Sequence, residues 1–250
     1  MTIAALLLLA ACLYGWGLAR AHARGRSFSR WAIVAFASGL VVIALALTGP
    51  VDRLADASFS WHMTEHLLLT GLAAPLLLLG APLRLALAAL PARQASTLAR
   101  VMRSAPVRWL THPIVALVLF LAVLYGTHFS PLYEAALENE NVHAFEHALY
   151  LTAALLFWTP ILAVAPAPHA PSHPLRIMTL FLAMPTCAFL GFAFYVARHV
   201  LYPHYAAMPG ALADQRDAGT VMWLGGGVPL FLALLWCVGD WGARERRLAT

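Results

Sequence analysis

Two short segments of this 250-residue chain carry the same pattern of chemically active side chains. Residues 61–66 read WHMTEH and residues 143–147 read HAFEH, so the pattern H-x-x-E-H occurs twice. On an α-helix, positions i, i+3 and i+4 share one face, so the three polar side chains of each copy project together. Two neutral imidazoles four residues apart can bind one metal ion, and a carboxylate can bind the ion or orient a ring. The candidate metal ligands are His62, Glu65, His66, His143, Glu146 and His147.

These residue types allow three kinds of chemistry. Imidazole ligands suit copper, zinc, iron and nickel, so a copper carrier is one candidate. A zinc hydrolase is the second, with three histidines on the ion and Glu65 or Glu146 as the general base for a bound water. H-x-x-E-H also occurs in zinc peptidases, although there it pairs with a distant third ligand and here it is duplicated. The third is a haem-binding bundle, which would prefer opposed histidines deeper in a membrane.

The composition predicts the element that positions these residues, a bundle of membrane helices. The chain is 62% hydrophobic and 11% charged, with a mean hydropathy of +0.76, whereas soluble domains are about a quarter charged. A membrane-spanning helix needs about 20 mostly apolar residues. We therefore expect an all-α polytopic bundle in which residues 1–250 form a single integral membrane domain. Its seven predicted spans are residues 2–19, 31–49, 61–80, 110–128, 142–164, 175–198 and 218–239.

The arginines predict the orientation of the bundle. Every basic residue is Arg, and four arginines follow the first span, five follow the third, one precedes the sixth and three lie in the C-terminal tail. With the N-terminus outside, all of these lie on the inner side, and only Arg53, Arg198 and Arg216 lie outside. Inner loops are enriched in Arg, so we expect the N-terminus outside and the C-terminus inside. This topology explains the net charge of +5 without a nucleic-acid partner.

This orientation places both H-x-x-E-H copies near the outer membrane face. His62 and His66 open the third span from outside, His143 and His147 open the fifth, and His128 closes the fourth on the same side. Ionisable residues inside membrane spans usually face the bundle interior and often mark a functional site. The sequence therefore predicts one polar site, or two, at the outer ends of these spans.

The matching segments belong to a longer repeat. Pro50 lies 12 residues before His62 and Pro131 lies 12 before His143, so spans 2–3 and 4–5 read as copies of one helical hairpin. A third copy in spans 6–7 has Pro203 12 residues before Gln215, but it lacks the histidines. Binding sites in membrane bundles often form between such repeats.

Four segments together resemble a known family. They are H-M-x-x-H-L-L-L with APLLLLGAP in residues 62–82, THFSPLYEAALEN in 127–139, HAFEHALYLTAALLFW in 143–158, and LADQRDAGTVMWLGGG in 212–227. On these motifs the chain resembles the CtaG family of cytochrome c oxidase assembly factors of the caa3 type. Asp214 and Gln215 match a polar motif of that family, for which the sequence gives no role.

The resemblance implies a non-enzymatic assembly factor for haem–copper oxidases, located in the bacterial plasma membrane. It implies copper as the metal, bound on the outer, periplasmic side and delivered to the oxidase. The expected partners are oxidase subunits, the lipid bilayer and a periplasmic copper donor. By resemblance, His66, His128, His143 and His147 are the ligands, with His62 and Glu146 in support.

Overall fold

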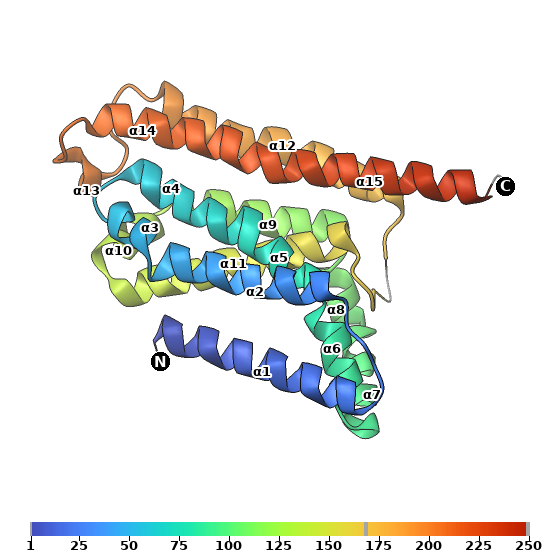
Figure 1. The fold of residues 1–250 in the computed structure, drawn as a ribbon. Coiled ribbons are helices and arrows are strands. Elements are labelled where there is room, and N and C mark those ends of the chain that lie inside the picture. The colour runs from blue at the N-terminus through green and yellow to red at the C-terminus, as the bar shows by residue number, and fades with distance from the viewer. Residues whose placement is uncertain (1, 168–169, 249–250) are drawn as a thin grey trace.

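The chain folds as a bundle of α-helices in this computed structural model, which describes residues 2–167 and 170–248. The long helices lie roughly side by side, and no β-strand occurs within those two ranges (Figure 1). The all-α prediction is therefore confirmed. The elements are α1 (Ile3–Ala23), α2 (Arg30–Leu47), α3 (Pro50–Ala55), α4 (Phe59–Leu67), the π-helix η1 (Leu68–Ala73), α5 (Ala74–Leu79), α6 (Pro82–Ala89), α7 (Ala92–Met102), α8 (Ala105–Leu110), α9 (Pro113–His128), α10 (Pro131–Glu138), α11 (Glu140–Leu162), α12 (His173–Val196), α13 (Pro203–Ala206), α14 (Ala211–Thr220), the π-helix η2 (Val221–Gly225) and α15 (Gly226–Leu248).

Six helices in the described part of the chain are long and apolar enough to cross a membrane, and a bent pair gives a seventh. The pair is α9 with α10, which meet at an angle of 66° after Phe129 and Ser130. Figure 1 shows the start of α1 and the end of α15 at opposite ends of the bundle, as the seven predicted spans would place them. The fourth predicted span, 110–128, is shorter than expected because its helix begins only at Pro113.

The segments between the predicted spans contain short helices. At one end of the bundle lie α3, α10 and α13, and at the other end lie α6, α7 and α8 (Figure 1). Pro50, Pro131 and Pro203, the prolines aligned by the repeat, each begin one of the first three. A proline suits the first helical turn, because its missing N–H would have no partner there. The hairpin repeat stays a prediction, but its three copies begin in the same way.

The third span changes its helical pitch just below the H-x-x-E-H segment. η1 follows α4 directly, and a π-helix frees backbone groups from the regular hydrogen-bond ladder. The Thr70 carbonyl oxygen in η1 accepts a hydrogen bond from the Trp158 indole N–H of α11 at 2.8 Å. The Thr70 hydroxyl donates to the His66 carbonyl oxygen at 2.7 Å. These bonds fix α4 against α11, the two helices that carry the repeated motif.

Candidate metal centre

The start of α4 is held by a carboxylate from α14. Asp214 accepts hydrogen bonds from the Phe59 backbone N–H at 2.6 Å, the Ser58 hydroxyl at 2.9 Å and the Ser60 hydroxyl at 2.5 Å. A carboxylate at a helix N-terminus satisfies unpaired N–H groups and interacts favourably with the helix dipole. His62 follows within the same helical turn, so Asp214 positions the first histidine of the motif.

The start of α11 has its own cap. The Asn139 side-chain oxygen accepts from the Asn141 N–H at 2.9 Å and the Val142 N–H at 3.3 Å, directly before His143. Asn is among the preferred residues at this position. Both metal-ligand segments thus lie in the first turns of capped helices, which fixes the direction of their side chains.

Gln215, the neighbour of Asp214, fixes the segment between α12 and α13. Its side-chain oxygen accepts from the Leu201 N–H at 2.7 Å, and its amide nitrogen donates to the His199 carbonyl oxygen at 3.1 Å. The side chain is 1% exposed. The polar pair that the sequence left without a role therefore supports the site from α14.

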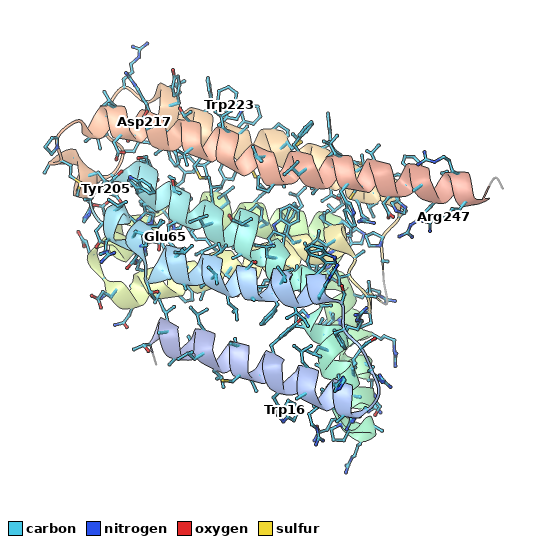
Figure 2. The ribbon with its side chains drawn as sticks, in the orientation of Figure 1. Trp16, Glu65, Tyr205, Asp217, Trp223 and Arg247 are labelled. Carbon is cyan, nitrogen blue, oxygen red and sulfur yellow. The ribbon has the colours of Figure 1, made fainter. Side chains whose placement is uncertain are left out.

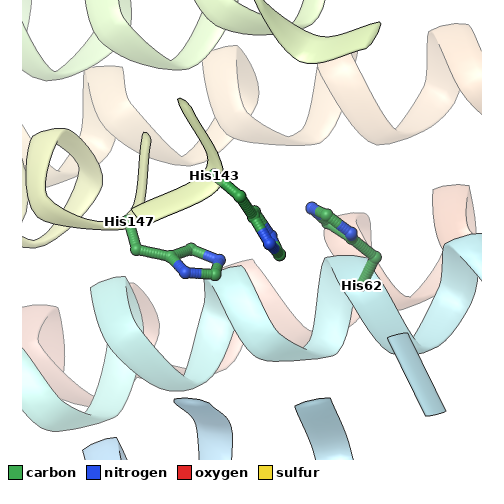
Figure 3. A group of neighbouring side chains, drawn as sticks. All are labelled: His62, His143 and His147. Carbon is green, nitrogen blue, oxygen red and sulfur yellow. The ribbon is translucent and has the colours of Figure 1, made fainter. Parts of the chain in front are cut away.

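The two H-x-x-E-H copies face each other between α4 and α11. The Nε2 atoms of His62 and His66 lie 3.1 Å apart. The ring of His62 stacks on that of His143, with centroids 5.1 Å apart and planes 26° apart, and the His143 and His147 centroids are 4.1 Å apart. Figure 3 shows His143 and His147 from α11 directed toward His62 on α4. We name these four histidines with Glu65 and Glu146 the His/Glu cluster.

The carboxylates of the cluster are arranged reciprocally. Glu65 of the first copy lies 3.4 Å from His147 Nε2 of the second, and Glu146 of the second lies 3.9 Å from His66 Nε2 of the first. Both glutamates are 0% exposed. Each copy therefore places its carboxylate beside the last histidine of the other copy. Figure 2 shows Glu65 and Tyr205 near the same end of the bundle.

Several buried atoms of the cluster lack hydrogen-bond partners among residues 2–167 and 170–248. They include all four carboxylate oxygens, together with His66 Nδ1, His143 Nε2 and His147 Nε2. Buried polar atoms in native proteins nearly always have a partner, and burying a carboxylate without one is costly. So many buried nitrogen and oxygen atoms without hydrogen-bond partners in one place are the pattern expected of a cation site.

The residues present fit a metal ion. Two sets of ligand atoms each lie within 4.8 Å of one another: His62, His143 and His147 in one, and His62, His66 and Glu146 in the other. Two nitrogens bound to one tetrahedral ion at 2.0–2.1 Å would lie about 3.3 Å apart. The His62–His66 nitrogen separation of 3.1 Å is close to that value. Glu65 lies outside both sets and contacts His147 instead.

His128, a ligand expected from the resemblance, lies beside the cluster and outside both sets. Its ring centroid is 6.0 Å from that of His66. Its Nδ1 lies 2.7 Å from the Leu124 carbonyl oxygen and 2.9 Å from the Tyr150 hydroxyl. Its Nε2 is buried and has no hydrogen-bond partner in the described chain. The ligand role of His128 stays a prediction.

Four tyrosines outside the predicted ligand set enclose the histidines. Tyr150 hydrogen-bonds His128, and Tyr202 donates to the His128 carbonyl oxygen at 3.0 Å. The Tyr133 ring lies 5.3 Å from the rings of both His62 and His128. All four side chains are buried; the members are Tyr133, Tyr150, Tyr202 and Tyr205. They form an aromatic wall that limits the access of water to the cluster.

Tyr205 holds the ring of His62 in place. Burial raises the pKa of the Tyr205 hydroxyl, so it keeps its proton at neutral pH. The hydroxyl lies 3.3 Å from the Ala55 carbonyl oxygen and 3.3 Å from His62 Nδ1. With Nδ1 on the Tyr205 side, Nε2 of the same ring faces His66, whose Nε2 lies 3.1 Å away.

The space around the cluster disfavours the haem alternative. The cavity beside His66 has a volume of about 40 Å³ and is lined by residues such as Leu124, Tyr150, Cys187 and Met222. A water molecule needs about 10–15 Å³ measured in this way, so the cavity has room for a few waters. A porphyrin ring would require α9, α11 and α15 to separate.

The fold and the site together define a polytopic helical membrane protein with a buried, histidine-rich candidate metal centre. The sequence comparison identifies the group to which it belongs. Residues 12–244 match the model of the cytochrome c oxidase caa3 assembly factor family, and the chain is a member of that family. The resemblance found in the sequence is thereby confirmed.

Similar proteins also occur in mycobacteria. The chain is 31% identical over 257 residues to uncharacterized proteins Mb0105 of Mycobacterium bovis and MT0111 of Mycobacterium tuberculosis. It is 28% identical over 254 residues to uncharacterized protein ML1998 of Mycobacterium leprae. The matches cover 94–95% of this chain but 38% of each relative, so the chain spans about two fifths of their length. No solved structure matches the chain.

Proposed function

We propose that this protein assists assembly of a caa3-type cytochrome c oxidase in the bacterial plasma membrane by binding copper in the His/Glu cluster and delivering it to the oxidase. The family supports the assembly role. The observation that carries the copper role is the convergence of two H-x-x-E-H segments on one buried group of unpaired nitrogen and oxygen atoms. Copper is cargo in this proposal, and the protein's residues bind it, orient it and exclude water from it.

The chemistry of the ligands supports copper. Imidazole binds copper well, and in the Irving–Williams order Cu²⁺ has the highest affinity for a given nitrogen and oxygen site. The ligands lie in the first turns of α4 and α11, near one end of the bundle, and His143 is only half-buried. A ligand near the surface allows a carrier to exchange its ion with a donor and with a client subunit.

A zinc hydrolase is the second candidate, because His62, His66 and Glu146 form a two-histidine, one-carboxylate set. Structural zinc sites are four-coordinate, whereas catalytic sites keep one position for water. In this alternative, Glu65 is left outside that set and would be the general base. The enzyme reading therefore requires tightly bound zinc and turnover that depends on Glu65.

The deciding experiment is elemental analysis of the protein purified in detergent, before and after titration with Cu⁺ and Cu²⁺. The test variant is the double substitution His66→Ala with His147→Ala. The control is His199→Ala, which removes an exposed histidine at the same end of the bundle. Stoichiometric copper in the wild type and the control, lost in the double variant, would support the proposal. Stoichiometric zinc would support the hydrolase, and the absence of any binding after titration would refute a metal role.

The link to the oxidase is tested in cells that depend on a caa3-type enzyme. Cells carrying the double variant should contain oxidase with a lower copper-to-haem ratio, while the His199→Ala control should keep the normal ratio. A normal ratio with the double variant would refute delivery by this cluster.

The orientation is tested by cysteine labelling in a variant whose natural cysteines are replaced by alanine. With the N-terminus outside, a membrane-impermeant maleimide should label His199→Cys in intact cells. It should label Ser96→Cys, on α7 at the other end of the bundle, only after permeabilisation. The opposite labelling pattern would refute the orientation.

A further inference from the structure

The two ligand sets of the cluster share one residue, His62, and differ in the rest. One set adds His143 and His147, and the other adds His66 and Glu146. His143 is half-buried, whereas His66 is 3% exposed and Glu146 is 0% exposed. The first set therefore includes a partly exposed residue and lies nearer the surface, whereas all three residues of the second set are buried.

Resting on the proposed function, we infer that the cluster binds a single metal ion at two alternative positions. The outer position is formed by His62, His143 and His147, and the inner position is formed by His62, His66 and Glu146. His62 stays bound to the ion while the ion moves from one position to the other.

The exclusion of a second ion follows from the chemistry of His62, whose Nδ1 lies 3.3 Å from the Tyr205 hydroxyl and whose Nε2 lies 3.1 Å from His66 Nε2. A neutral imidazole has one N–H and one nitrogen lone pair. One imidazole lone pair binds one ion at a time. An ion at the outer position therefore removes a ligand from the inner position, and movement inward requires His62 to exchange His143 and His147 for His66 and Glu146.

The two positions differ in charge, and this difference gives the transfer a direction. The outer set contains three neutral imidazoles, whereas the inner set contains a carboxylate that is buried without a hydrogen-bond partner in the part of the chain described. A buried cation is stabilised by a buried anion, because their attraction is weakly screened. The inner position therefore favours a divalent ion more strongly, and the outer position serves for loading and release.

The test uses the full-length protein in detergent with Cu²⁺ as the probe. Copper content gives the stoichiometry, electron paramagnetic resonance reports the ligands, and the rates of loading and of removal by a chelator are followed by stopped-flow absorbance. The variants are His143→Gln, Glu146→Gln and His62→Ala, with His199→Ala as the control. Size-exclusion profiles show whether each variant remains folded.

We expect the wild type and the control to bind one equivalent of copper. His143→Gln should keep the final spectrum of the wild type but load copper at least tenfold more slowly. Glu146→Gln should load copper at the normal rate but lose it to the chelator about 10–100-fold faster. That factor is the usual effect of removing a group that supports a metal site. His62→Ala should bind copper at neither the outer nor the inner position. Two equivalents in the wild type, or identical spectra and rates for His143→Gln and Glu146→Gln, would overturn the inference. No copper in the wild type would instead refute the proposed function itself.

Discussion

Replacing Asp214 with alanine should destabilise the protein and weaken metal binding at a site to which Asp214 contributes no ligand. Asp214 accepts from the Phe59 N–H, the Ser58 hydroxyl and the Ser60 hydroxyl, and a fourth, longer bond of 3.4 Å comes from the Ser60 N–H. Hydrogen bonds to a charged group contribute about 1.5–3 kcal/mol each when buried. This carboxylate is half-buried and the freed donors can recruit water, so we expect a loss of roughly 2–4 kcal/mol in all, about the contribution of one to two such bonds.

The assay combines unfolding with metal binding. The free energy of unfolding is measured by titrating mixed micelles with SDS, and copper affinity is measured by competition with a chelator. Affinity should fall with stability, because fraying of the first turn of α4 displaces His62. Asp217→Ala is the matched control, since Asp217 is an exposed acidic residue on the same helix. Equal stabilities for the Asp214 and Asp217 variants would refute the capping role, and normal copper affinity in a destabilised Asp214 variant would refute the link to His62.

Two further substitutions test the helix packing and the contact of Tyr205 with His62. Gly219→Ala should destabilise the bundle by at least about 1–3 kcal/mol, the usual cost of overpacking, because the new Cβ would lie 2.5 Å from the Gly191 carbonyl oxygen. Gly239→Ala, where no atom lies within 4 Å of the new Cβ, is its control, and equal thermal midpoints would contradict the reasoning. Tyr205→Phe should lower copper affinity about 10–100-fold, because it removes the hydroxyl that lies against His62 Nδ1 and fixes the His62 ring. Tyr195→Phe, at an exposed tyrosine, should leave the affinity unchanged.

The sequence predicted the class of fold and the helical face of each motif for simple physical reasons. Apolar runs of about 20 residues identify membrane helices, and the i, i+3, i+4 rule places His62, Glu65 and His66 on one face. The bend after α9 was also readable, because Ser130-Pro131 is typical of a helix break. Neither rule gives the rotation of one helix against another. The pairing of Glu65 with His147 therefore required the tertiary structure.

The residues that support the cluster differ in how readily the sequence indicates them. Tyr150 lies three residues after His147 on the same face of α11, so helical spacing was sufficient to place it near the cluster. Tyr202 directly precedes the four-residue helix α13, and Tyr205 lies within it. No sequence periodicity predicts the direction of a side chain in so short a helix. The contact of Asp214 with α4 joins residues more than 150 positions apart, and no local rule detects it.

The unpaired carboxylates lead to a prediction opposite to that for most core substitutions. Glu146 is fully buried, and neither of its carboxylate oxygens has a hydrogen-bond partner within residues 2–167 and 170–248. An unsatisfied buried polar group costs about 1–3 kcal/mol, and an apolar replacement of similar shape removes that cost. In the presence of a chelator, Glu146→Met should therefore be more stable than the wild type.

Added copper should act against this order of stability. Binding stabilises the native state by RT ln(1 + [L]/Kd), about 2.7 kcal/mol when the free ion is at 100 times its Kd. The wild type should gain this stabilisation, and Glu146→Met should gain less because it lacks one ligand of the inner set. Thermal unfolding with and without copper measures both effects. The opposite result would be a Glu146→Met variant that is less stable than the wild type in the absence of metal. It would mean that the Glu146 carboxylate has hydrogen-bond partners in the metal-free protein. The carboxylate oxygens would then no longer support a cation site.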